Sequence, residues 1–207
     1  MFISLDGGDG VGKSTQIRLL TEWLRAAGHD VLTCRDPGST PLGEAIRKIL
    51  LDAHDTPISR TSEMLLYMAA RAQLVAEVIQ PALAAGKTVI SDRYLLANVV
   101  YQGHAGGLDI NELWQIGRVA TAGVTPTLTV ILDMSPEAAA ARISRPLDRM
   151  ELQGDEFRRR LREGFLAEAA RRPHDCIVID AGRDIDTVQS DIRRAVERAF
   201  IARPGKP

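Results

Sequence analysis

The feature that most constrains this sequence is a glycine-rich turn close to its first residue. The stretch Gly7-Gly-Asp-Gly-Val-Gly-Lys-Ser14 matches the pattern G-x-x-x-x-G-K-S/T at every fixed position. An apolar run typical of a strand precedes the turn, and an amphipathic stretch typical of a helix follows it. In that setting glycines let backbone N–H groups turn inward around phosphate oxygens, and the helix N-terminus adds the positive end of its dipole. The sequence therefore predicts a phosphate-binding loop.

The loop and a later Asp-Arg pair carry the residue types that nucleotide chemistry needs. Lys13 supplies a charge to the β- and γ-phosphates, and the Ser14 hydroxyl can bind Mg²⁺. Asp92 ends a later apolar run, where a carboxylate can hold Mg²⁺ directly or through water; capping of the next helix is the alternative. Arg93 follows and is expected to face the space beyond the γ-phosphate, where it would bind an acceptor phosphate; the alternative is a surface arginine. A nucleotide ligand is predicted, but the loop alone does not fix the reaction.

Five short apolar runs alternate with longer helical patterns along the chain. The runs are continuous rather than alternating, which is typical of parallel strands covered on both faces. The alternation predicts an α/β domain with right-handed crossovers. We expect strands at Phe2–Leu5, Val31–Cys34, Thr88–Ser91, Leu128–Leu132 and Cys176–Ile179, and helices at Lys13–Ala27, Pro41–Leu51, Thr61–Ala85, Ile110–Ala122, Pro136–Ile143, Glu156–Arg171 and Ile185–Ile201.

Length and charge exclude several classes of protein. The 207 residues suit one domain, or one domain with an inserted lid, and the net charge of −1 argues against a general nucleic-acid-binding role. No apolar stretch approaches the roughly 20 residues that a membrane span needs, and no signal peptide is evident. The two cysteines, Cys34 and Cys176, are too few for a disulfide framework. These features predict a cytoplasmic protein that binds neither nucleic acid nor a membrane.

Arginine strongly outnumbers lysine in this sequence, with 22 arginines and only 4 lysines. A compositional bias explains this asymmetry as readily as function does. Guanidinium groups also bind phosphate bidentately, so some of the arginines are candidates for phosphate recognition.

Several separated motifs, taken in order from Phe2 to about Ala199, resemble the thymidylate kinase family. Outside the phosphate loop each motif is weak alone, and their shared order makes the resemblance specific. It implies a P-loop NTPase three-layer α/β fold, with a five-stranded parallel sheet flanked by helices. It also implies a homodimer that transfers the γ-phosphate of ATP to dTMP with Mg²⁺, giving ADP and dTDP for dTTP synthesis. The motifs are Asp6–Thr15, Arg35-Asp-Pro-Gly-Ser-Thr40, Tyr67-Met-Ala-Ala-Arg-Ala-Gln73, Asp92-Arg-Tyr94, Tyr101-Gln-Gly103 and Leu147-Asp-Arg-Met-Glu151, followed by Phe157 and Gly164-Phe165.

The resemblance also implies roles for single residues. In dTMP binding, Asp9 approaches the sugar 3′-hydroxyl, Tyr67 stacks on thymine, and Tyr101 crowds the sugar 2′ position. Taken alone, each of these tyrosines is more often a core residue than a ligand-binding one. The implied dTMP-binding residues are Asp9, Pro37, Tyr67, Arg71, Arg93, Asn98, Tyr101 and Gln102. The implied ATP-binding residues are Gly7, Gly8, Asp9, Gly10, Val11, Gly12, Lys13, Ser14, Thr15, Arg142 and Gly182, with Ser14 and Asp92 on the metal.

A basic lid at about residues 142–156 is the last implied element. Some members of the family carry an arginine in the phosphate loop where this chain has Gly10, and members with glycine there have lid arginines instead. A mobile cation that closes over the transferring phosphoryl group lowers the barrier. The expected catalytic residues are Lys13, Arg93, Arg145 and Arg149, with Arg149 preferred within the lid. Residues 1–201 are expected to form one domain, and residues 202–207 a disordered tail.

Three positions depart from the family pattern, and other nucleotide-binding functions are alternatives. Ser39 stands in place of a common glycine, and Ala97 and Val100 replace a usual Ser and Ala, which bears on base selectivity. A kinase for dUMP or a deoxynucleoside is the nearest rival. A GTP-dependent switch needs an Asn-Lys-x-Asp motif, which the sequence lacks, and a partition-type ATPase needs a lysine where Asp6 stands.

Overall fold

One parallel sheet of five strands forms the centre of the molecule. The computed structural model describes residues 1–52 and 57–201, so the predicted disordered tail lies outside the described residues. The strand order is β2-β3-β1-β4-β5, and every pairing is parallel. All five predicted strands are confirmed, each extended by one or two residues at its carboxyl end. The strands are β1 (Phe2–Gly7), β2 (Val31–Arg35), β3 (Thr88–Asp92), β4 (Leu128–Asp133) and β5 (Cys176–Asp180).

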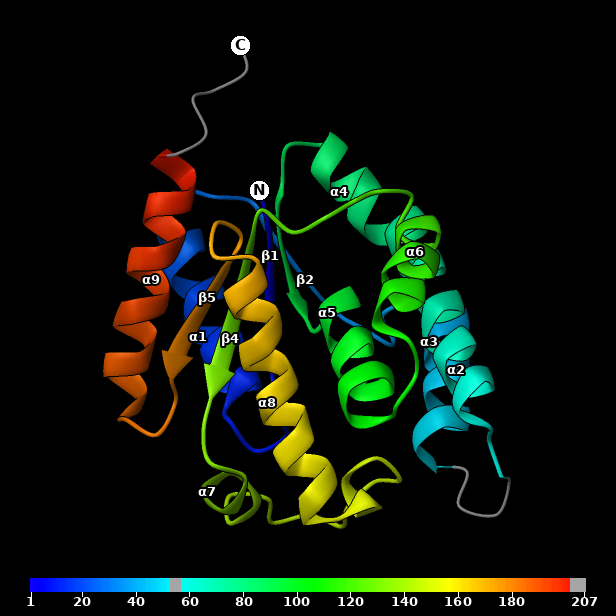
Figure 1. Cartoon of the computed structure of the whole chain (residues 1–207). Helices are drawn as coiled ribbons and strands as arrows, with labels where there is room; N and C mark the ends of the chain where they lie inside the picture. Colours follow the sequence, from blue (N-terminus) through cyan, green and yellow to red (C-terminus); the bar gives the residue numbers. More distant parts are fainter. Residues whose placement is uncertain (53–56, 202–207) are drawn as a thin grey trace.

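Helices cover both faces of the sheet, which confirms the predicted three-layer α/β fold (Figure 1). One face packs against α1 (Lys13–Ala26) and α9 (Ile185–Ile201), where Leu5, Leu24 and Ile192 are fully buried. The other face buries the neighbouring side chain Phe2 against the remaining helices. Because successive strand residues point to opposite faces and both faces are covered, the strands read as unbroken apolar runs.

The remaining helical elements lie between the strands along the chain. In the part of the chain that the structure describes, no helix is both long and apolar enough to cross a membrane. The elements are α2 (Pro41–Asp52), α3 (Arg60–Leu74), a π-helical turn (Val75–Ile79), α4 (Gln80–Ala84), α5 (Leu95–Asn98), a π-helix (Val99–Ala105), α6 (Ile110–Ala120), α7 (Pro136–Ala140), a 3₁₀ turn (Glu151–Gln153) and α8 (Asp155–Arg171).

Two helical features differ from the sequence prediction. The helix expected over Thr61–Ala85 is interrupted at Val75–Ile79, where Gln80 N–H donates to Val75 O instead of to the carbonyl four residues back. Pro81 follows at once, and a proline inside a helix has no N–H and clashes with the preceding turn, so the wider π turn accommodates it. The helical stretch Leu95–Ala105 was not predicted, although it forms part of the site.

Candidate active site

The phosphate-binding loop lies at the carboxyl edge of the sheet, between β1 and α1. Gly7 and Gly10 have φ values of 133° and 82°, which L side chains rarely adopt. A Cβ atom at Gly7 would lie 2.5 Å from Leu132 O, and one at Gly10 would lie 2.1 Å from Ala139 O. Glycine is therefore required at both positions. At Gly10 the end of α7 occupies the space that a larger residue would need.

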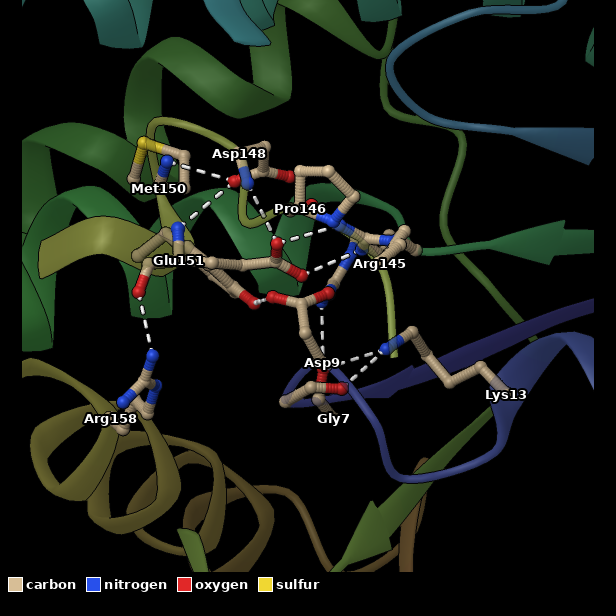
Figure 2. A network of polar contacts seen from close by, with 12 residues as sticks. Gly7, Asp9, Lys13, Arg145, Pro146, Asp148, Met150, Glu151 and Arg158 are labelled. Atoms are coloured by element: carbon tan, nitrogen blue, oxygen red, sulfur yellow. Dashed lines mark hydrogen bonds and ion pairs between the residues drawn. The ribbon is translucent and has the colours of Figure 1, made fainter. Parts of the chain in front are cut away.

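Lys13 begins α1, and its buried side chain folds back over the loop. Its Nζ donates to Gly7 O at 3.2 Å and to Gly8 O at 2.5 Å (Figure 2). Burial and the nearby positive charge of Arg93 lower the pKa of Lys13 from 10.5 to about 8. A phosphate in the loop would stabilise this ammonium by its negative charge, so the geometry suits an anionic ligand.

Arg93 connects the end of β3 to the phosphate loop. Its Nη1 donates to Gly7 O at 2.7 Å and its Nη2 to Asp9 Oδ1 at 2.6 Å, while Tyr101 Oη donates to Asp9 Oδ2 at 2.9 Å. Burial raises the pKa of Asp9, but Arg93, Lys13 and the Tyr101 hydrogen bond together hold it below its usual range. Arg93 has a φ of 67°, a strained value that is found mainly at functional sites.

Two adjoining cavities meet at this cluster. We call the first the phosphate-loop cleft; it runs along residues 9–16, Asp92 and the lid residues Arg142 and Arg145. We call the second the Tyr67 cavity. Its wall includes Leu51, Ala97, Asp148 and Met150, together with residues expected from the sequence. A ligand in one cavity would meet a ligand in the other at the residues that line both, which are Asp9, Asp36, Arg47 and Arg93.

Most residues expected from the sequence line one of these cavities. Gly7 and Gly8 shape the loop instead through their backbone, and Gly182 lies between two cleft residues, Ala181 and Arg183. Arg142 donates to Ala181 O at 3.3 Å. The expected residues in the phosphate-loop cleft are Asp9, Gly10, Val11, Gly12, Lys13, Ser14, Thr15, Asp92, Arg93, Arg142 and Arg145; those in the Tyr67 cavity are Asp9, Pro37, Tyr67, Arg93, Asn98, Tyr101 and Gln102.

Arg71 lies behind the wall of the Tyr67 cavity and is only 1% exposed. Its Nε donates to Asp36 Oδ2 at 2.5 Å, and its Nη1 donates to Asn98 Oδ1 at 2.8 Å. Because Asp36 and Asn98 both line the cavity, Arg71 holds two of the groups that a ligand would touch. Its own expected contact with a base stays a prediction.

The segment 141–154, which covers most of the lid expected at about residues 142–156, folds around a buried carboxylate. Glu151 accepts from Arg145 Nη1 at 2.8 Å and from Arg145 Nη2 at 2.7 Å, and Asp148 N–H donates to it at 2.9 Å. The side chain of Arg145 is 58% exposed. Figure 2 shows Arg145 and Glu151 facing Asp9 and Lys13 of the phosphate loop. Arg145, like Arg142, thus places a lid charge at the phosphate-loop cleft.

Arg149, the lid arginine that the sequence favours, lies elsewhere. Its Nε donates to Leu50 O at 2.7 Å, and its Nη2 pairs with Glu63. Among the described residues that line the two cavities it is absent, although its neighbours Asp148 and Met150 line the Tyr67 cavity. Its expected role over the transferring phosphate stays a prediction that requires this ion pair to open.

The structure adds site residues that the sequence did not single out. Arg47, on α2, lines both cavities and donates to Pro37 O at 3.0 Å. Burial and the neighbouring Arg35 lower its pKa. No motif marks Arg47 among the 22 arginines; its place on a helix face beside the loop could have been suspected only from the tertiary contact. Glu63, which accepts a hydrogen bond from Gln102, was missed for the same reason, whereas Asp148 and Met150 lie within the motif Leu147–Glu151 and were given no role of their own.

The donor atoms of the phosphate-loop cleft fit a magnesium ion. Ser14 and Asp92, the expected metal residues, both line it. The described residues contain no group of three or more His, Cys, Asp or Glu that could hold a metal by themselves. Magnesium at phosphate sites typically takes one or two protein oxygens and completes its shell with water and substrate phosphates. A hydroxyl and a carboxylate beside a phosphate-binding loop satisfy that requirement.

The loop at the carboxyl edge of the parallel sheet defines the class: this is an α/β protein with a P-loop NTPase-like fold and a second cavity beside the phosphate-binding loop. A family model described as thymidylate kinase matches residues 5–192. The chain belongs to the thymidylate kinase family.

Named relatives agree over nearly the whole chain. It is 45% identical to a thymidylate kinase of Symbiobacterium thermophilum over 204 residues, which are 98% of this chain and 95% of that protein. It is 44% identical to a thymidylate kinase of Synechococcus sp. (strain JA-3-3Ab) over the full length of both. A crystal structure of thymidylate kinase from Ehrlichia chaffeensis superposes with a TM-score of 0.79 at 31% identity, covering 95% of this chain and 98% of that chain. The resemblance in the motifs therefore extends to the whole fold.

Proposed function

We propose that this protein is a dTMP kinase, which transfers the γ-phosphate of ATP to dTMP and releases ADP and dTDP. The observation that carries the proposal is the junction of the two cavities, where Arg47 and Arg93 lie between the phosphate loop and the Tyr67 cavity. Two cations at the junction suit a reaction in which an acceptor phosphate must approach the γ-phosphate despite like charge.

Each cavity supplies one substrate site in this proposal. ATP lies along the phosphate-loop cleft, with its phosphates on the backbone N–H groups and Lys13 and its base near Arg142 and Gly182. The acceptor lies in the Tyr67 cavity with its base against the Tyr67 ring, its sugar beside Asp9 and Tyr101, and its phosphate on Arg93. Pro37, Asn98 and Gln102 complete the wall around the base.

The chemical step joins the two sites. An oxygen of the dTMP phosphate attacks the γ-phosphorus of ATP, and the bond from that phosphorus to the β–γ bridging oxygen breaks, so the charge leaves on ADP. Lys13 and Arg93 stabilise the charge that spreads over the phosphate oxygens. Ser14 and Asp92 would hold Mg²⁺, which when bound neutralises charge on the ATP phosphates. Burial of the reacting groups beneath the segment 141–154 excludes water and limits ATP hydrolysis.

The segment at about residues 142–156 acts as the lid of a single domain, residues 1–201. Arg142 and Arg145 are the lid cations that line the cleft, and Arg149 would contribute once it leaves Glu63. The reaction would take place in the cytoplasm, where dTDP feeds dTTP synthesis. We further propose that two copies of the chain form a homodimer.

A coupled assay of ADP release tests the activity. With ATP and Mg²⁺ we expect rapid turnover with dTMP, slower turnover with dUMP and other nucleoside monophosphates, and almost none without an acceptor. Lys13→Ala should abolish transfer while the far-ultraviolet circular dichroism spectrum stays unchanged. Acceptor-independent ATP turnover, or full activity of Lys13→Ala, would contradict the proposal.

A further inference from the structure

A buried chain of hydrogen bonds runs along the wall of the Tyr67 cavity. Arg71 Nη1 donates to Asn98 Oδ1 at 2.8 Å, and Asn98 Nδ2 donates to Gln102 Oε1 at 2.6 Å. Gln102 Nε2 then donates to Glu63 Oε1 at 2.8 Å. All four side chains are buried, and the two amides also line the cavity. We call Arg71, Asn98, Gln102 and Glu63 the amide relay.

The charged ends of the relay fix its direction. The Arg71 guanidinium can only donate hydrogen bonds, and the Glu63 carboxylate can only accept them. Each amide between them must therefore turn its oxygen towards Arg71 and its nitrogen towards Glu63. A reversed amide would set oxygen against oxygen or N–H against N–H, which is strongly unfavourable where no water can intervene.

Arg149 secures the carboxylate end. Glu63 Oε2 accepts from Arg149 Nη2, while Arg149 Nε donates to Leu50 O at the end of α2. The side chain of Glu63 is only 9% exposed, so water does not replace these partners. With a donor on each oxygen, Glu63 acts purely as an acceptor, and it joins the cavity wall to the segment 141–154.

The direction of the amides decides which hydrogen-bonding atoms the cavity presents to a base. Thymine carries an N3–H donor between two carbonyl oxygens, whereas cytosine carries an unprotonated N3 beside an amino group. The two bases therefore need opposite arrangements of donors and acceptors. We propose that Glu63 is a positioning residue that sets selectivity for the acceptor base by fixing the orientation of the Asn98 and Gln102 amides. This inference rests on the proposed dTMP kinase activity and names a determinant of its specificity.

Glu63→Gln tests the role, because it keeps the shape of the side chain and adds a donor. The new amide can accept from only one of the two donors that the carboxylate holds, Gln102 Nε2 and Arg149 Nη2, so the Gln102 amide is no longer held in the arrangement that suits thymine. Steady-state kinetics with dTMP and dCMP at saturating ATP give the ratio of their kcat/KM values. We expect that ratio to fall at least about tenfold, through a higher KM for dTMP and a gain of turnover with dCMP, with the KM for ATP unchanged.

A matched control separates this role from the loss of any buried carboxylate. The side chain of Glu168, on α8, is 2% exposed and pairs with His104, Arg171 and Arg172, outside the described lining of both cavities. Glu168→Gln should leave the dTMP to dCMP ratio unchanged.

A second variant keeps the test decisive if Glu63→Gln does not fold. Gln102→Met interrupts the relay and leaves Glu63 intact, and it should lower the ratio as well. A ratio within about twofold of wild type in the folded relay variants, or an equal fall in Glu168→Gln, would overturn the inference. A wild-type protein without dTMP-dependent turnover would instead overturn the proposed function.

Discussion

Asp6, the residue before the phosphate loop, has no exposed surface. Ser4 Oγ donates to its Oδ2 at 2.5 Å, and within the described residues its Oδ1 has no hydrogen-bond partner. Burial raises the pKa of Asp6 from 3.8 to about 6, although Ser4, Arg93 and Lys13 oppose that rise. A carboxylate with one unsatisfied oxygen is costly in such a place, so Asp6 lowers the stability of the protein once it ionises.

Asp6→Asn should make folding stability less dependent on pH. The folded state binds more protons than the unfolded state between pH 4 and 6, so the stability present at low pH is lost as the pH rises through about 6. Two pKa units correspond to about 3 kcal/mol. We expect urea denaturation to show the gain of the variant over wild type growing by about 2 kcal/mol between pH 4.5 and 7.5. Asp30→Asn, at a side chain 68% exposed, is the control. A gain that does not vary with pH would contradict this account.

Single residues were predictable where a local motif marks them. Lys13, Asp92 and Arg93 follow from a loop and a strand end, and the structure brings them into one cleft. Arg47 and Glu63 were not predictable, because their importance comes from contacts with segments far away in the sequence. Motifs identify the residues that bear the chemistry, whereas the side chains that hold them in place depend on tertiary packing.

At the scale of elements, hydrophobic periodicity is the signal that predicts a helix or a strand from the sequence. The amphipathic helices were predictable, but Leu95–Gln102 is buried on all sides, so no polar stripe marks it as a helix. That stretch carries Asn98, Tyr101 and Gln102 into the Tyr67 cavity. The most enclosed element of the site therefore has the weakest sequence signature.

The contact between the phosphate loop and α7 makes Gly10→Ala a test of this interface. A Cβ at Gly10 meets Ala139 O at 2.1 Å, so the end of α7 must move. We expect a loss of about 2–3 kcal/mol in unfolding free energy, from left-handed strain of about 1–2 kcal/mol and the displaced contact, with weaker ATP binding. Thermal denaturation and ATP titration measure both effects.

Gly28→Ala is the matched control, because its φ of 88° imposes the same strain while a Cβ there meets nothing within 4 Å. It should cost about 1 kcal/mol and leave ATP affinity unchanged. Equal effects of the two variants would show that the α7 contact is unimportant.

At the scale of the whole molecule, the parallel sheet followed from the sequence and the assembly of the site did not. Continuous apolar runs gave the strands, and every strand ends at the same edge. The order β2-β3-β1-β4-β5 then places β3 beside β1, which brings Arg93 to the phosphate loop. Strand order depends on long-range pairing that no local pattern encodes, so the junction of the two cavities became visible only in the fold.

An apolar face on α2 and α3 is the basis for the proposed homodimer. Leu42, Ile49 and Leu65 are each 47–50% exposed, and the exposed Ala45 and Ala69 continue the same face. Both helices lie at one side of the molecule, opposite α9 (Figure 1). In a twofold dimer one patch meets its own copy, so each apolar position contributes two buried side chains, one from each copy.

Leu65→Asp should therefore convert the dimer into a monomer. Each interface would receive two unpaired carboxylates, which cost several kcal/mol to bury, and would lose the burial of two leucines at about 2 kcal/mol each. We expect sedimentation at micromolar concentration to give twice the chain mass of 22.6 kDa for wild type and a single mass for the variant, with an unchanged circular dichroism spectrum. Ile201→Asp, at a side chain 80% exposed on α9, should stay dimeric. A monomeric wild type would remove the homodimer, and a dimeric Leu65→Asp would place its interface elsewhere.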